Sequence, residues 1–580
     1  MAVSGYAVGM VSDIGNQIAH LSGSEAIIFD IAVILIVSAV LAFIAKALRQ
    51  PLIPAYVLTG LIIGPLVFGF IKNQELILAF SEMGIALLLF IAGLEISFKK
   101  IKEANLKKIA LIGTFQIIVV FAIVFLFKGI LDLTSLQAAY IGIILAFGST
   151  MVDIKLLADK GELVTLHGRL VLGILLLQDL VAIIAIVVFT TSGFAVAPLF
   201  FAFAKLAGIL ILAMVLQKYV LNKMFRLAAQ STEMLFLLSL AVLFLFIILA
   251  YIAEISIVIG AFIAGVSLAN SPFKTELESR ISPLRDFFAI LFFVALGMQI
   301  VFTGVGQRLA LLAMLLIGAF FIKPVITTIL LRFTGYRPRT SFLTSISLAQ
   351  LSEFSLIIGA LGLSLGVLDM SIFSTVILAT IITMSMTPYF INYKDQIYNV
   401  FKYPVALFKF LPIKEDLEYV DEADKEILLI GAHRMGGVLL KELMKKRDKL
   451  LIIDYNPEVI ASLIKNKISC IYGDICSPDL LSKINLKKLK LVICTVPGYD
   501  ENLHALKKIK AINPRIKVVV TGSRISETLT LYENGADFVI TPKVVAGQEL
   551  ARIIHSEKAD LKKAKKEHMR HLNDIHKLLY

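Results

Sequence analysis

Long apolar runs dominate the first 393 residues and limit what this chain can fold into more than any other feature. Each run is close to the roughly 20 residues that a helix needs to cross a bilayer. Because lipid offers no partners to open backbone groups, the runs predict an all-α membrane domain. Thirteen such segments are expected, near residues 25–48, 52–71, 75–97, 108–128, 136–158, 168–191, 198–226, 232–253, 255–270, 284–303, 307–332, 340–365 and 370–393.

Basic residues fall mainly in alternate connections between these runs, beginning with Lys46 and Arg49 after the first. By the positive-inside rule, this asymmetry predicts a multi-pass protein of the inner or plasma membrane, with its N-terminus outside and its C-terminal part in the cytoplasm. The formal net charge is +13, but no patch mixes basic and aromatic residues as a nucleic-acid groove does. The first 24 residues lack a basic n-region with a cleavage site, so we expect no removable signal peptide.

One carboxylate, Asp179, interrupts the apolar run of residues 168–191, and Gln178 precedes it. A charged side chain near the bilayer centre costs on the order of 2.5–3.5 kcal/mol on insertion scales, so it is retained mainly where it faces protein, water or a transported ion. Asp179 is therefore the first candidate to bind a cation, K⁺ or Na⁺, or a proton. The alternative is a carboxylate that only holds two helices together.

Two of the expected segments place small hydroxyl residues and an acid at mid-membrane. The fifth contains Ser149, Thr150 and Asp153, and the twelfth contains Ser352 and Glu353. Unwound backbone is tolerated in a membrane only where it is buried in protein or lines a cavity, and two interrupted segments in corresponding positions are typical of inverted repeats. The alternative is that the hydroxyls bond to their own helix backbone. The occurrence of this pattern in both the fifth and the twelfth segment favours two broken helices that cross.

A third intramembrane charge is Lys323, which a further apolar stretch separates from Arg332. A long amine near a helix end can reach the membrane surface. The depth of Lys323 in its segment favours an acidic partner instead, either Asp179 or Glu353.

After residue 425 the pattern changes to short apolar strands that alternate with helices. A strand, a glycine turn, a helix and a second strand that ends in an acid follow the order of a Rossmann-like α/β domain. His433 stands where the second glycine of the fingerprint is usual, so AMP, NAD(H) and no ligand stay open, in that order. The candidate nucleotide-contacting residues are Gly431, Ala432, His433, Arg434, Met435, Gly436, Asp454 and Asp474.

These patterns predict five parts of the chain. Cys470, Cys476 and Cys494 all lie in the C-terminal part without metal-ligand spacing, so we expect thiols in a reducing cytosol and no tightly bound metal. The predicted parts are an extracytoplasmic segment at 1–24, the transmembrane domain at 25–393, a linker at 394–425, the Rossmann-like regulatory domain at 426–556 and a charged helix at 557–580.

Four motifs follow one another along the membrane domain: Gly148-Ser149-Thr150, Gln178-Asp179, the run from Phe292 to Met298, and Ser352-Glu353-Phe354. They resemble the second monovalent cation:proton antiporter family. The Gln-Asp pair and the C-terminal domain are most similar to the Kef-type potassium efflux antiporters. The C-terminal domain itself resembles the N-terminal lobe of RCK domains, the TrkA-N type, which dimerise and sense a nucleotide.

The resemblance implies a homodimer, formed through the transmembrane and RCK domains, that works by elevator-like alternating access. It implies that Asp179 binds the cation and the proton in turn, with Gln178 beside it and Lys323 as the core lysine. Asp153 occupies a position that is usually uncharged in the Kef branch, and it is either a second cation ligand or a structural partner. Further ion-binding candidates are Ser149 and Thr150, and Ser352 and Glu353 are supporting residues.

We therefore expect a regulated monovalent cation/proton antiporter and not an enzyme, with K⁺ favoured over Na⁺ on the resemblance alone. Because the Gln178 amide cannot carry a proton, one acid remains at this pair, and the exchange is expected to be electroneutral. The alternatives are a Na⁺/H⁺ antiporter and a potassium channel gated by the RCK domain. Such a channel would need a TVGYG-like filter, which the sequence lacks. An ancillary cytosolic regulator is a further expected partner, whereas nucleic acid is not.

Overall fold

The structure is a computed structural model of the chain. It describes residues 24–71, 74–95, 106–160, 162–190, 196–228, 231–269, 271–301, 306–406, 418–419, 425–432, 435–473, 475, 484, 486 and 488–555. The chain divides into two compact units near Pro412, and each unit is described by itself.

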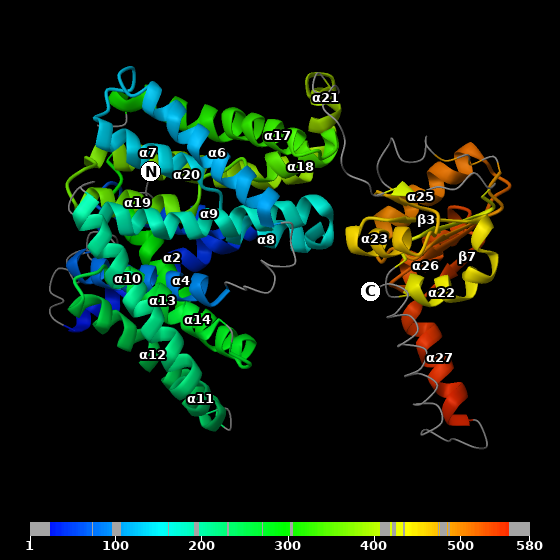
Figure 1. Cartoon of the computed structure of the whole chain (residues 1–580), viewed down its shortest axis with the longest axis horizontal. Helices are drawn as coiled ribbons and strands as arrows, with labels where there is room; N and C mark the ends of the chain where they lie inside the picture. Colours follow the sequence, from blue (N-terminus) through cyan, green and yellow to red (C-terminus); the bar gives the residue numbers. More distant parts are fainter. Residues whose placement is uncertain are drawn as a thin grey trace, which may run out of the picture. The chain divides into compact units, whose positions relative to one another are not determined.

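Helices make up the first unit (Figure 1). In chain order they are α2 (Ser24–Ala47), α3 (Leu52–Ile63), α4 (Gln74–Glu95), α6 (Leu106–Leu126), α7 (Ser135–Ala146), α8 (Thr150–Asp159), η1 (Glu162–Val164), α9 (Leu166–Thr190), α10 (Val196–Leu216), η2 (Gln217–Leu221), α11 (Asn222–Ala228), α12 (Thr232–Ile252), α13 (Ile257–Leu268), α14 (Lys274–Met298), η3 (Gly306–Arg308), α16 (Leu309–Ile317), η4 (Gly318–Ile322), α17 (Lys323–Phe333), α18 (Pro338–Ser347), α19 (Glu353–Ser364), α20 (Met370–Asn392) and α21 (Lys394–Ala406).

Among the described residues, nine helices are long and apolar enough to cross a membrane. The shorter apolar helices are Leu52–Ile63, Ala79–Leu94, Ile257–Leu268 and Glu353–Ser364. The expected all-α membrane architecture is therefore confirmed. The number of thirteen crossings stays a prediction.

Close packing between α3 and α14 depends on two glycines. A Cβ atom on Gly60 would lie 1.9 Å from the carbonyl oxygen of Val294, and one on Gly297 would lie 2.0 Å from that of Val57. Helices inside a membrane gain little from the hydrophobic effect, so small residues that let two backbones approach are what holds them together. Gly297 belongs to the Phe292–Met298 motif, which gives that motif a packing role.

The second unit is an α/β domain. Its elements are β1 (Glu418–Tyr419), β2 (Ile427–Ile430), α22 (Met435–Leu443), η6 (Met444–Lys449), β3 (Leu450–Asp454), α23 (Pro457–Lys465), β4 (Cys470–Tyr472), β5 (Leu491–Cys494), α25 (Tyr499–Ile512), β6 (Lys517–Thr521), α26 (Ile525–Glu533), β7 (Phe538–Ile540) and α27 (Pro542–His555). Figure 1 shows α27 extending away from the sheet.

The strands form one sheet in the order β1-β4-β3-β2-β5-β6-β7, parallel except for the antiparallel pair of β1 and β4. Alternate residues of each strand face opposite layers. In β2, Ile427 and Leu429 pack in a core with α22 and α23, whereas Leu428 and Ile430 pack in a core with α25 and α26. Both faces are thus covered, which confirms the predicted Rossmann-like fold.

Two elements fall inside the stretch 394–425 that the sequence analysis treated as a linker, namely α21 and β1. The segments 1–23 and 557–580 lie outside the described residues. The five-part division of the chain stays a prediction.

Candidate functional site

The fifth and twelfth segments are both interrupted, as the sequence predicted. The first break separates α7 from α8 at residues 147–149, and the second separates α18 from α19 at residues 348–352. At the first, the hydroxyl of Ser149 accepts a hydrogen bond from the N–H of Val152 (3.3 Å). At the second, the hydroxyl of Ser352 accepts one from the N–H of Phe354 (3.1 Å). The small hydroxyl residues therefore begin each second half-helix as N-caps.

The two breaks meet each other inside the membrane unit. The Gln350 side chain of the second break donates to the carbonyl of Ser149 in the first (3.3 Å). The amine of Lys323 bridges both, because it donates to the carbonyl of Phe147 (2.9 Å) and to that of Gln350. These contacts bring the interrupted segments together as the predicted crossing.

Lys323 is fully buried, and its partners correct one prediction. The predicted pairing of Lys323 with Asp179 or Glu353 is wrong. The amine bonds instead to two main-chain carbonyls, one from each break. The reason is that unwound backbone leaves carbonyls that no helical N–H reaches, and an ammonium group offers three donors to them.

Asp179 lies on α9 beside the first break. The hydroxyl of Thr150 donates to Asp179 Oδ2 at 2.8 Å. Thr150 is the first residue of α8, so the carboxylate lies beside the positive end of that helix. Asp179 is half-buried. The site therefore combines a carboxylate, a hydroxyl and a helix N-terminus.

Gln178 is fully buried and bonds to the break itself. The N–H of Gly148 donates to Gln178 Oε1 (2.9 Å), and Gln178 Nε2 donates to Gln116 Oε1 (2.6 Å). Gln116 Nε2 in turn donates to the carbonyl of Ala146 (3.0 Å). Gln116 is not among the predicted site residues. A signal for it exists in the sequence, since an amide within the apolar run 108–128 needs a hydrogen-bond partner.

Two further acids are buried near the crossing. Gln350 Nε2 donates to Asp153 Oδ1 (2.9 Å), and the Thr387 hydroxyl donates to Gln350 Oε1 (2.7 Å). Glu353 opens α19 and is 5% exposed. Among the described residues, Asp153 Oδ2 and Glu353 Oε2 are buried atoms without a hydrogen-bond partner. The structure therefore gathers the predicted residues of both breaks into one polar region.

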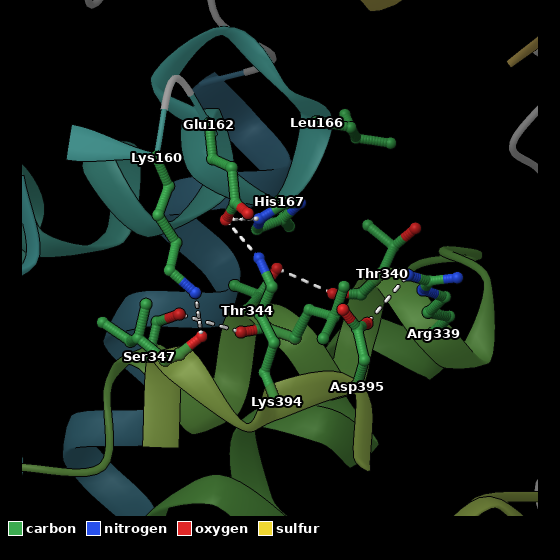
Figure 2. A network of polar contacts seen from close by, with 12 residues as sticks. Lys160, Glu162, Leu166, His167, Arg339, Thr340, Thr344, Ser347, Lys394 and Asp395 are labelled. Atoms are coloured by element: carbon green, nitrogen blue, oxygen red, sulfur yellow. Dashed lines mark hydrogen bonds and ion pairs between the residues drawn. The ribbon is translucent and has the colours of Figure 1, made fainter. Parts of the chain in front are cut away.

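A second polar cluster lies where α8 ends (Figure 2). The amine of Lys160 donates to the carbonyl of Ile391 at the end of α20 (2.8 Å). Glu162 Oε2 lies 3.1 Å from Nε2 of His167 and is also bonded to the amine of Lys394, the first residue of α21. We name these four side chains, Lys160, Glu162, His167 and Lys394, the α8-end cluster. It ties the end of α8 to the junction of α20 and α21.

Electrostatics favour the charged form of Glu162 in this cluster. Burial by itself would raise the pKa of the Glu162 carboxyl. The hydrogen bond with His167 and the charge of Lys394 outweigh burial and lower this pKa from its ordinary 4.5 to about 2. Burial, together with the charge of Lys394, lowers the pKa of Lys160. Nearby, Arg339 pairs with Asp395 at 2.8 Å, which links α18 to α21.

Two described glycines of the second unit, Gly431 and Gly436, stand where their lack of a side chain is required. Gly431 has φ +83°, which favours glycine. A Cβ atom on Gly436 would lie 1.8 Å from the carbonyl oxygen of Gly431, so α22 packs directly on the turn. These features fit the close approach of a nucleotide phosphate to the N-terminus of α22, which begins at Met435.

Asp454 has a second role that the sequence did not reveal. Its Oδ2 accepts from the N–H of Ala432 (2.6 Å), and its Oδ1 accepts from the N–H of Asn456 (2.7 Å). The carboxylate therefore fixes the glycine turn, and its contact with a ribose stays a prediction. The predicted contacts His433, Arg434 and Asp474 lie outside the described residues.

Comparisons with known proteins agree with this architecture. Residues 32–392 match the transmembrane sodium/hydrogen exchanger family, and residues 427–542 match the TrkA-N domain. The chain is 27% identical over 525 residues to the glutathione-regulated potassium-efflux system protein KefC of Escherichia coli O7:K1 (strain IAI39 / ExPEC), which covers 89% of this chain and 80% of the relative. The protein of the same description from Escherichia coli (strain K12) is 26% identical with the same coverage.

A solved structure supports the fold of the membrane unit. The sodium proton antiporter MjNhaP1 from Methanocaldococcus jannaschii matches with a TM-score of 0.50 and 17% identity, over 66% of this chain and 98% of that one. The resemblance to Kef-type antiporters is confirmed, and so is a multi-pass membrane protein with a TrkA-N domain. The placement of AMP ahead of NAD(H) gains no support from these matches. With most of its membrane unit matched, the chain belongs to the sodium/hydrogen exchanger family.

Proposed function

We propose that this protein exchanges K⁺ for H⁺ across the membrane and that Asp179 binds the two ions in turn. The contact that carries the proposal is the 2.8 Å hydrogen bond between Thr150 and Asp179 at the first break. An intramembrane acid marks an ion pathway, and transporters bind cations near the bilayer midplane beside unwound backbone. The N-terminus of α8 stabilises the negative charge of Asp179 between ions. The potassium-efflux relatives favour K⁺ over Na⁺.

Cation and proton compete for the same carboxylate in this proposal. A proton on Asp179 removes the negative charge that attracts the cation, so one ion leaves when the other binds. The Thr150 hydroxyl suits both states of the site. It donates a hydrogen bond to the free carboxylate, and its oxygen lone pairs can bind a cation. Ser149 and Asp153 lie at the same break and complete the proposed ion-binding set.

The exchange is one for one in this proposal, because Gln178 has no proton to release and its amide bonds to Gly148 and Gln116. The site then carries the same net charge whether it holds a cation or a proton. Membrane voltage does no net work on such a cycle, in contrast to about 2.3 kcal/mol per 100 mV for each net charge moved. The exchange would cease to be electroneutral if Lys323 or Asp153 gained or lost a proton during the cycle.

The test is transport by the purified protein in proteoliposomes. Addition of K⁺ should drive proton movement more strongly than the same concentration of Na⁺, with no steady current on a solid-supported membrane. Empty liposomes serve as the control. Movement driven by Na⁺ alone would make the protein a Na⁺/H⁺ antiporter. A steady current would show that Lys323 or Asp153 takes part in coupling.

The TrkA-N domain is proposed to regulate this exchange from the cytoplasm, in a homodimer whose N-termini lie outside. Its ligand is a nucleotide, with NAD(H) placed ahead of AMP because the domain matches the TrkA-N family and the turn suits a phosphate. Binding would shift an equilibrium between conformations that differ in transport rate. NAD(H) should change K⁺-driven proton flux of the full-length protein, and AMP or glutathione should be compared at equal concentration. An unchanged flux with every ligand would leave the domain as a platform for dimerisation and for a cytosolic regulator.

A further inference from the structure

A chain of two side-chain amides joins two main-chain groups at the start of the first break. It starts at the N–H of Gly148, passes through Gln178 on α9 and Gln116 on α6, and ends at the carbonyl of Ala146. Both glutamines are fully buried. The chain therefore spans the two main-chain groups that lie on either side of the point where α7 ends.

The direction of each amide is fixed by the main-chain group at each end. Gly148 supplies a donor, so Gln178 must present its oxygen there and its nitrogen to Gln116. Gln116 then accepts with its oxygen and donates to the carbonyl of Ala146. A buried donor or acceptor that loses its partner is costly, so a network of this kind is stable only when every member is satisfied.

We infer that Gln116 is a positioning residue for cation exchange: it orients Gln178, which holds the first break so that Thr150 meets Asp179. Gln116 itself bonds to Gln178 and to the break, whereas Thr150 bonds to the carboxylate. The residue thus acts on Asp179 from a different helix. The inference rests on the proposed function, since it concerns the affinity of that site for a cation.

The first test replaces the amide with an apolar side chain of similar size, Gln116→Leu. The apparent KM for K⁺ should rise on the order of tenfold, the scale of one lost buried partner, with a smaller change in the maximal rate. Ser239→Ala is the matched control, because this buried hydroxyl bonds only to the carbonyl of Leu235 in its own helix α12. A purely structural role would lower the yield of folded Gln116→Leu and leave its KM unchanged, as in Ser239→Ala.

The second test uses Gln116→Glu, which distinguishes positioning from packing. A neutral carboxyl group both accepts and donates, as the amide does, whereas a carboxylate cannot donate to the carbonyl of Ala146. The KM of this variant should approach that of the wild type at low pH and rise above it as pH increases. Asp179 on α9 and Lys323 on α17 are ionisable groups on neighbouring helices, and comparison with the wild type at each pH removes their contribution.

Two results would overturn the inference. One is an unchanged KM in Gln116→Leu, and the other is a Gln116→Glu variant whose KM follows the wild type at every pH. Either result would leave the proposed exchange intact, because the wild type would still transport. Absence of K⁺-driven proton movement in the wild type would instead contradict the proposed function.

Discussion

The two breaks at the crossing differ in what completes their hydrogen bonds. The first break, between α7 and α8, is bonded by amides and an amine: Gln178, Gln350 and Lys323 contact it, and Gln116 contacts Ala146 where α7 ends. The second break, between α18 and α19, shares Lys323 and is otherwise bonded by hydroxyls. The N–H of Ser352 donates to the hydroxyl of Ser355 (3.2 Å), and Thr383 and Thr387 of α20 supply further hydroxyls to the same break.

The candidate carboxylates beside the two breaks, Asp179 and Glu353, differ in how exposed they are. Asp179 is half-buried and bonds to the residue that opens α8, whereas Glu353 is 5% exposed and opens α19 itself. A carboxylate that exchanges ions must be reached by them, and a sealed one cannot serve in the same way. This difference fits the proposed function, in which the first break serves exchange and the second serves support.

Lys323 bonds to both breaks, so its loss should have the largest effect. Lys323→Met leaves the carbonyls of Phe147 and Gln350 without their donor, at about 1–3 kcal/mol for each unpaired group. Thermal unfolding of the detergent-solubilised protein should show a strongly lowered Tm. Lys205→Met is the control, because its amine pairs with Glu254 at an exposed site. Equal Tm values for the two variants would show that Lys323 does not hold the crossing.

The α8-end cluster should make a smaller, pH-dependent contribution to the free energy of unfolding. It lies where α8 ends, away from the first break. Since the pKa of Glu162 is lowered from 4.5 to about 2, its stabilisation is complete above about pH 4.5 and is lost as pH falls through about 2. Glu162→Gln should lower the free energy of unfolding by about 1.5–3 kcal/mol at neutral pH, the range for hydrogen bonds to charged groups. The difference between wild type and variant should shrink toward pH 2. A difference that is constant with pH would contradict the role of the charge.

The smallest expected effects come from substitutions of the hydroxyl residues that begin α8 and α19, and they should distinguish the two breaks. Thr150→Val should raise the apparent KM for K⁺ on the order of tenfold with little change in Tm, because it removes the hydroxyl that meets Asp179. Ser352→Ala should do the opposite, with a loss of about 1 kcal/mol in stability from the missing N-cap and an unchanged KM. The same change of KM in both variants would mean that the breaks are functionally equivalent.

Much of the fold could be predicted because single segments encode it. The apolar runs indicate membrane helices from length alone, and the alternation of strands and helices after residue 425 indicates a Rossmann-like domain. Both breaks could be predicted as well, since hydroxyl residues and an acid at mid-membrane are costly in an unbroken helix.

The partners across the crossing could not be predicted from the sequence. Charge suggested Asp179 or Glu353 as the partner of Lys323, but the sequence does not show which carbonyls an unwound segment leaves open. Gln116 was missed for the same reason, because its partners lie on α7 and α9 and no local pattern links them. Asp454 was predicted only as a ribose contact, and its bond to the turn depends on how the strands align.

The contrast between the two breaks is tested most directly by a pair of matched substitutions in proteoliposomes. Asp179→Asn and Glu353→Gln each replace an acid by an amide of the same shape, and an amide has no proton to exchange. Asp179→Asn should abolish K⁺-driven proton movement while the protein still folds, as judged by its Tm. Glu353→Gln should retain it, because Glu353 at the second break is 5% exposed and opens α19. Retained exchange in Asp179→Asn, or its loss in Glu353→Gln alone, would contradict the assignment of the ion-binding carboxylate.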